Sequence, residues 1–182
     1  MRVRALAYVL AAAGIAASIA GFWIPLKAQL AYGLMDRAFE ESTESDAPAK
    51  PWSWADFGVI GKLEIEGESV HILDRATGQS LAFGAGLHEE YGVPADPIVL
   101  SGHRDTHFKA LKGVKAGTLI PLLDMQGKAI YRVKETRIFD MREGTLALPP
   151  KGHLLLITCW PFDGIDPGTT KRFLVLAEKL DS

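Results

Sequence analysis

The sequence has only one cysteine, Cys159, among its 182 residues. A single cysteine excludes an intrachain disulfide, so packing must stabilise the fold without that help. A basic excess is also missing: 20 Lys and Arg face 22 Asp and Glu, which argues against nucleic acid as the main partner. We find no internal repeat. The length, with 48% hydrophobic and 23% charged residues, predicts one folded domain or at most two.

Charge is absent from residues 5–26, and Arg2 and Arg4 precede this run. A helix of this length can cross a hydrocarbon core of about 30 Å. The positive-inside rule then leaves the N-terminus in the cytoplasm and exports the rest. We therefore expect residues 1–27 to form a transmembrane anchor. A signal peptide cleaved near residues 18–20 and a buried core helix are the alternatives.

Residues 28–50 are expected to form a stalk. Apolar residues keep helical spacing as far as Phe39, and residues 40–50 are mostly polar or acidic, which predicts a solvated linker. The catalytic domain is expected over residues 51–182.

Short apolar runs alternate with turn residues after residue 59 and predict a mostly β domain. We expect strands at 60–65, 70–73, 81–84, 98–102, 118–122, 130–139, 154–159 and 173–179. Short helices are expected near 103–112 and 87–91. About eight strands with little helix predict a closed or nearly closed β-barrel.

Cys159 ends the apolar strand expected at 154–159, and Trp160-Pro161 follows it. Because proline cannot donate to a strand ladder, the strand stops there and leaves the thiol beside a loop. A reactive group is well placed at such a position. A buried, inert thiol is the alternative.

Two other polar residues occupy strand ends. His103 follows the strand expected at 98–102, directly after Gly102, and Arg172 opens the last strand. Taken singly, a surface histidine and an arginine at the barrel rim explain them. If the strands ending at Cys159 and starting at Arg172 pair antiparallel, these two residues become neighbours.

Thiol acyl transfer needs these three groups together. A sulfur nucleophile attacks a carbonyl, an acid–base group moves the proton, and a fixed cation stabilises the oxyanion. We therefore predict Cys159 as nucleophile, His103 as proton-transfer partner and Arg172 as charge stabiliser. No metal ion or other cofactor is needed in this scheme, and the substrate-binding residues stay unknown.

Three motifs resemble the sortases, and more closely their Gram-negative class, the marine proteobacterial type. They are Ser-Gly-His-Arg-Asp-Thr-His-Phe at 101–108, Leu-Ile-Thr-Cys-Trp-Pro-Phe at 156–162 and Arg-Phe-Leu-Val at 172–175. The resemblance covers about residues 51–177, and the Ala-Phe-Gly run at 82–84 also fits. Leu155 departs from the Thr that opens the common Thr-Leu-x-Thr-Cys signature.

The resemblance implies an eight-stranded sortase-type β-barrel with short helices after one N-terminal transmembrane helix. It implies His103, Cys159 and Arg172 as catalytic residues. The enzyme would cleave an LPxTG-like C-terminal sorting signal of an exported protein between Thr and Gly, through a Cys thioacyl intermediate, and transfer it to an amine acceptor. The partner implied is one dedicated protein with a von Willebrand-type A domain. The implied location is the inner (cytoplasmic) membrane, with the catalytic domain in the periplasm.

Two other functions stay open. His103 and His107 have the i, i+4 spacing of a zinc helix, although Arg104 replaces the Glu that would act as base. A zinc-dependent periplasmic hydrolase is therefore one alternative. The other is a non-catalytic periplasmic β-domain that binds a partner and buries Cys159.

Overall fold

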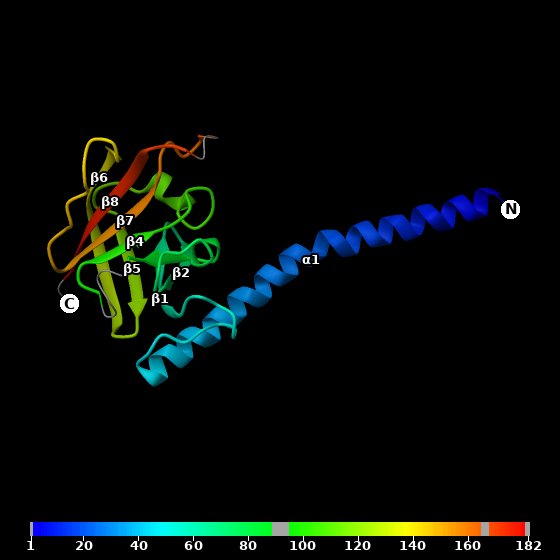
Figure 1. Cartoon of the computed structure of the whole chain (residues 1–182), viewed down its shortest axis with the longest axis horizontal. Helices are drawn as coiled ribbons and strands as arrows, with labels where there is room; N and C mark the ends of the chain where they lie inside the picture. Colours follow the sequence, from blue (N-terminus) through cyan, green and yellow to red (C-terminus); the bar gives the residue numbers. More distant parts are fainter. Residues whose placement is uncertain (1, 89–94, 165–167, 181–182) are drawn as a thin grey trace.

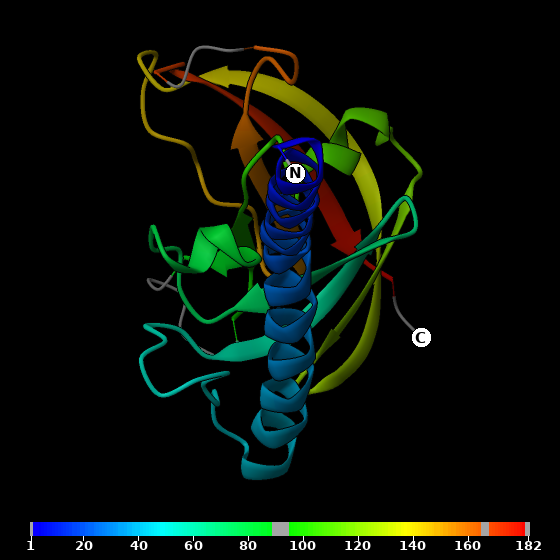
Figure 2. The same ribbon diagram turned by 90° about the vertical axis from the view of Figure 1, so that its right-hand side faces the viewer.

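The computed structural model describes residues 2–88, 95–164 and 168–180. A long N-terminal helix, α1 (Arg2–Ser45), leads into a closed barrel of eight strands (Figure 1). The far half of the helix projects from the barrel (Figure 1), and in the view turned by 90° the helix lies in front of the barrel (Figure 2).

The strands are β1 (Val59–Ile65), β2 (Glu68–Leu73), β3 (Ala85–Leu87), β4 (Ile98–Ser101), β5 (Leu119–Asp124), β6 (Gly127–Asp140), β7 (His153–Cys159) and β8 (Lys171–Lys179). They close in the order β1-β2-β3-β4-β7-β8-β6-β5, and β5 pairs back with β1. The pairs β2–β3 and β4–β7 are parallel and the others are antiparallel. The predicted eight-stranded, mostly β barrel is confirmed.

The strand expected at 81–84 is wrong. Residues Ser80–Ala82 form the 3₁₀ helix η1, and β3 begins only at Ala85. Local hydrogen bonds explain the difference: the Ser80 amide donates to Thr77 Oγ1 at 3.1 Å, and the Gly84 amide donates to the Ser80 carbonyl at 3.1 Å. These bonds give the apolar Leu81 and Ala82 a helical turn in place of a ladder.

Another short helix, η3 (Lys109–Gly113), overlaps the end of the helical segment expected near 103–112, and residues 104–108 form turns. Of the helix expected at 87–91, Leu87 is instead the last residue of β3, and residues 89–91 lie outside the described residues.

Strand alternation builds two apolar layers. The inward face supplies the barrel core, in which Leu154, Leu156 and Val175 are fully buried. The outward face of β4, β7 and β8 carries a smaller cluster around Val99, Leu155 and Leu174. Because the core fills the barrel, the fold needs no disulfide.

The polar segment expected as a solvated linker is helical as far as Ser45. Tertiary contacts stabilise this end of α1. Met35 and Phe39 pack in a cluster with Phe57 of the barrel domain. Ser42 is fully buried, and its hydroxyl lies 2.6 Å from the Val59 carbonyl and 2.8 Å from the Ala38 carbonyl.

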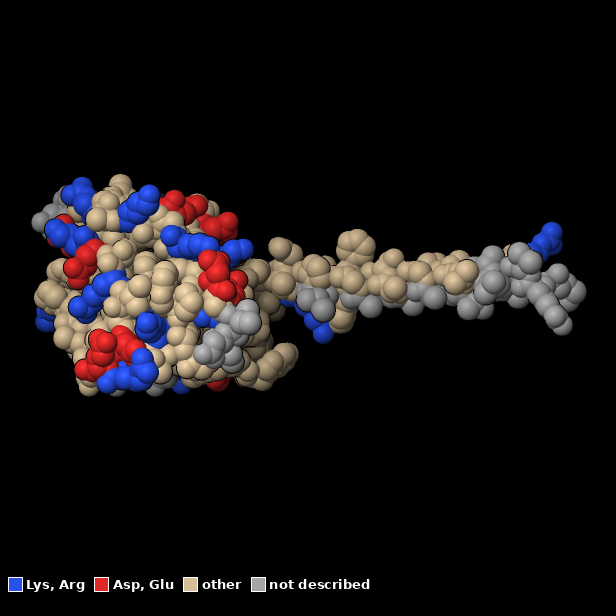
Figure 3. Space-filling model, turned by 90° about the horizontal axis from the view of Figure 1, so that it is seen from above, with Lys and Arg blue, Asp and Glu red and all other residues tan. Residues whose placement is uncertain are grey.

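Within the residues that the structure describes, no helix is both long enough and apolar enough to cross a membrane. This finding goes against the transmembrane helix predicted over residues 1–27. That prediction rested on the absence of charge, and much of the charge-free run is Ala, Gly and Ser. Charged side chains of both signs are spread over the barrel face seen in Figure 3, and few lie along the described part of the projecting helix.

Candidate active site

Cys159 and Arg172 are direct partners in the β7–β8 ladder. The antiparallel register pairs Ile157 with Leu174 and Cys159 with Arg172. Opposite residues of antiparallel strands place their side chains on the same face, with Cβ atoms about 4.5–5.5 Å apart. The register therefore makes Cys159 and Arg172 neighbours at one end of the barrel, as expected if these two strands pair antiparallel.

His103 joins them through a parallel pair. Strands β4 and β7 run in the same direction, with Ser101 opposite Ile157. The pairing continues beyond β4, because the Gly102 amide donates to the Ile157 carbonyl at 3.2 Å. His103 and Cys159 each lie two residues past the Ser101–Ile157 pair, so both lie at the same end of the β4–β7 pair.

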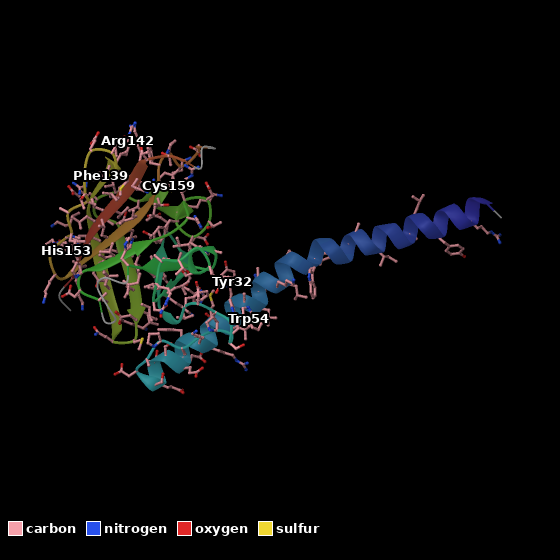
Figure 4. All side chains as sticks on the ribbon, in the orientation of Figure 1. Tyr32, Trp54, Phe139, Arg142, His153 and Cys159 are labelled. Carbon is pink, nitrogen blue, oxygen red and sulfur yellow. The ribbon has the colours of Figure 1, made fainter. Side chains whose placement is uncertain are left out.

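The registers of β4, β7 and β8 and the parity of their residues align His103, Cys159 and Arg172 as one row on the outer face. Cys159 shares its parity with Leu155 and Ile157 of β7, and the residues between them, such as Leu156, face the barrel core. Figure 4 shows Cys159 in the upper part of the barrel and His153, the first residue of β7, lower and at its left edge. The thiol is partly buried and His103 is exposed. Their catalytic roles stay predictions.

An apolar groove lies on the same outer face of the barrel as Cys159, on the side of the row toward the start of β7. It has a volume of about 210 Å³, and its walls come from β6, β7, β8 and the segment before β7. Its apolar lining residues are Ala147, Leu148, Pro149, Pro150, Leu155, Leu174 and Leu176, and β6 adds the charged Glu135 and Arg137. Leu155 lies four positions before Cys159, and Leu174 lies two positions after Arg172, so the groove leads toward the row.

The loop between β7 and β8 orients Arg172. Arg172 Nη1 donates to the carbonyls of Thr169 (2.7 Å) and Lys171 (3.0 Å). The Thr169 hydroxyl in turn donates to the Trp160 carbonyl at 2.6 Å, and Trp160 stacks on Phe173 with ring centroids 5.7 Å apart. These contacts hold the guanidinium group of Arg172 against the β7–β8 loop at the rim of the barrel.

Sequence reasoning missed two residues that connect this row. Thr158 is 2% exposed, and its hydroxyl donates to the Gly102 carbonyl at 2.7 Å. Arg104 is 8% exposed, and its Nη1 donates to the Pro161 carbonyl at 2.9 Å. The signal for Thr158 was its position two residues after Leu156, which puts its hydroxyl on the core-facing side of a buried strand. Arg104 carried no comparable signal.

The geometry of residues 103–107 differs from that of a zinc helix. They form a turn that begins where β4 ends, and the His103 carbonyl accepts a bond from the Phe108 amide at 3.0 Å. His107 Nε2 lies 3.2 Å from the Ala82 carbonyl. Burial lowers the pKa of His107, and the neighbouring charge of His103 lowers it further. Among the described residues, no group of three or more His, Cys, Asp or Glu side chains is placed to hold a metal ion.

Residues 62–180 match the Sortase family, described as a sortase domain. Sortase D of Bacillus subtilis (strain 168) is 26% identical over 144 residues, which cover 77% of this chain and 72% of that protein. Sortases are cysteine transpeptidases, so the match favours acyl transfer over a zinc hydrolase and over a domain that only binds.

Solved sortases share the fold. Sortase A from Corynebacterium diphtheriae gives a TM-score of 0.59 at 21% identity, and the similarity covers 84% of this chain and 85% of that one. Sortase A of Listeria monocytogenes gives 0.58 at 24% identity, with 68% and 88% covered. At these identities the similarity shows a common fold and nothing finer.

Proposed function

Because the chain belongs to the sortase family of cysteine transpeptidases, we propose that it cleaves a sorting signal through a thioacyl intermediate on Cys159 and transfers the acyl group to an amine. The observation that carries the proposal is the row formed by His103, Cys159 and Arg172 across β4, β7 and β8. The row collects a nucleophile, an acid–base group and a permanent cation on one accessible face.

Each group has one part in the proposed reaction. The Cys159 sulfur attacks the scissile carbonyl, and Arg172 donates hydrogen bonds to the oxyanion that forms. His103 gives a proton to the departing amine as the C–N bond breaks, which leaves a thioester on Cys159. An acceptor amine then attacks the thioester and loses its proton to His103. The new amide forms and the sulfur leaves.

The apolar groove supports a sorting peptide as substrate. Its leucine and proline side chains offer an apolar surface on the same face as Cys159. An extended peptide in this groove would bury apolar side chains and bring its scissile bond to the row. We therefore propose that the groove binds the residues on the N-terminal side of the cleaved bond.

The finer substrate proposals rest on the sequence motifs at 101–108 and 156–162. We propose a chain of the Gram-negative, marine proteobacterial class. Its proposed partner is one dedicated exported protein with a von Willebrand-type A domain and an LPxTG-like tail, cleaved between Thr and Gly. Export of the catalytic domain to the periplasm stays a prediction. Alkaline phosphatase fused after Ser182 should be active in cells if that prediction is right and inactive if the C-terminus stays in the cytoplasm.

A peptide panel tests the function. The purified protein is mixed with LPxTG-like peptides and an amine such as triglycine, and the products are identified by mass spectrometry. We expect cleavage after Thr and a new peptide joined to the amine, with Cys159→Ala inactive. Cleavage at another bond would overturn the proposed signal, and equal activity of Cys159→Ala would overturn the proposed nucleophile.

Arg172→Ala tests the oxyanion role. Loss of one positioned donor typically lowers the rate about 10²–10³-fold, and we expect that loss in turnover. Arg172 is only partly buried at the rim, so the melting temperature should change little. Arg172→Lys keeps the charge and serves as the matched control. A folded Arg172→Ala variant with a near-normal rate would exclude the role.

A further inference from the structure

Arg104 is a buried charged residue beside His103. Only 8% of it is exposed, and its guanidinium group reaches across to the loop that follows Cys159. Nη1 donates to the Pro161 carbonyl at 2.9 Å, and Nη2 donates to the Gly164 carbonyl. Nε also lies 3.4 Å from an Asp105 carboxylate oxygen. One side chain thus links the segment after β4 to the segment after β7.

The chemistry of this contact suits arginine. A guanidinium group stays charged at every accessible pH, and its planar fork can donate to two carbonyl oxygens at once. Burying such a charge is costly unless its hydrogen bonds are made. The contact is therefore specific, and neither a shorter donor nor a single ammonium group could reproduce both bonds.

Gly164 completes the contact from the loop side. A Cβ at this position would lie 3.2 Å from Arg104 Nη1 and 3.0 Å from Pro161 Cγ. Both distances are shorter than ordinary contact, so a side chain at residue 164 would push the loop away from the guanidinium group. The absence of a side chain at this position fits the close approach of Arg104.

We infer that Arg104 is a positioning residue, which holds residues 160–164 against the turn at 103–107 and so fixes His103 relative to Cys159. His103 lies beyond the last residue of β4, so the strand ladder alone does not set its position. Arg104 is its sequence neighbour, and Pro161 follows Cys159 by two residues. The kinetic consequence of this inference rests on the proposed function, whereas the coupling of His103 to Cys159 does not.

A second link between the same segments provides a control. Lys112 Nζ lies 2.8 Å from both carboxylate oxygens of Asp163, and the two side chains are 58% and 82% exposed. Exposed ion pairs contribute little. Lys112→Ala should therefore leave the site unchanged, although it removes a contact between the same loop and η3.

The first test needs no substrate. Iodoacetamide alkylation of Cys159 is followed from pH 6 to 9 in the full-length protein, in His103→Ala and in Arg104→Gln. We expect the wild-type and His103→Ala profiles to differ, and the Arg104→Gln profile to move toward that of His103→Ala. Gly164→Ala should shift it in the same direction, and Lys112→Ala should match wild type. Melting curves show which variants fold. If Arg104→Gln does not fold, Arg104→Lys and Gly164→Ala take its place in the comparison.

The second test separates kcat from KM for thioester formation. A displacement of about 1 Å between reacting groups can cost about 10²-fold in rate, so Arg104→Gln should lower kcat by about that factor and leave KM within about threefold. Arg104→Lys should recover part of the loss. Coincident wild-type and His103→Ala alkylation profiles, or an unchanged Arg104→Gln profile, would overturn the inference. If the wild type forms no thioester, the proposed function fails, and the alkylation result still decides the role of Arg104.

Discussion

Replacing Thr158 by Val should affect both stability and catalysis. The Thr158 hydroxyl is buried, and its 2.7 Å bond to the Gly102 carbonyl joins β7 to the peptide unit that precedes His103. Valine keeps the shape and removes the donor. A lost buried hydrogen bond that leaves its acceptor unpaired costs about 1–2 kcal/mol. In a chain of this size that is roughly 2–8 °C in melting temperature.

Thr158→Ser is the matched control because it keeps the donor and loses a buried methyl group. That methyl contributes about 0.8 kcal/mol, so Thr158→Ser should lose somewhat less free energy of unfolding in urea than Thr158→Val. They should differ in the rate of thioester formation. We expect Thr158→Val to be about tenfold slower, since the peptide that carries His103 is less constrained, and Thr158→Ser to be close to wild type. Equal rates for the two variants would refute the reasoning.

Two further predictions concern the contact between α1 and the barrel. Met35 is fully buried and Leu30 is 64% exposed. Met35→Ala should therefore lower the free energy of unfolding by about 2–5 kcal/mol, whereas Leu30→Ala should change it little. Equal urea unfolding curves for the two variants would mean that α1 does not dock on the barrel. His71 lies 2.8 Å from Asp36, which also pairs with Lys62, and burial lowers the pKa of His71. The unfolded chain then binds the proton of His71 more readily than the folded chain, so stability should fall as the pH drops from 7.5 to 5. The pKa of Asp36 is lowered, so Asp36 stays ionised over this range. His71→Phe should flatten this dependence, and an unchanged slope in urea melts would count against it.

Local patterns predicted most of the barrel. Seven expected strands overlap observed ones because alternating or continuous apolar runs have few other ways to bury their side chains. The failure at 81–84 came from Thr77 and Ser80, whose side chains stabilise a turn that apolar content alone does not reveal. The helix at 40–45 was missed because Ser42 is stabilised by a carbonyl from β1, a tertiary contact that outweighs the polar composition.

The candidate site was predictable only in part. Cys159 and Arg172 lie on consecutive strands joined by one loop, and two such strands commonly pair antiparallel, which makes the two residues partners. The place of His103 depends on the parallel β4–β7 pair, which bypasses β5 and β6 and leaves no trace in local sequence. Arg104 was beyond prediction for the same reason. Its carbonyl partners lie 57 and 60 residues away in the sequence.

Trapping the thioacyl enzyme tests the central claim most directly. The wild type and Cys159→Ala are each mixed with an LPxTG-like peptide without an amine acceptor, and their intact masses are measured. We predict an adduct equal to the N-terminal part of the peptide, present on the wild type, absent from Cys159→Ala and released by hydroxylamine as expected of a thioester. An adduct of the same mass on Cys159→Ala, or peptide cleavage by Cys159→Ala at the wild-type rate, would contradict the account.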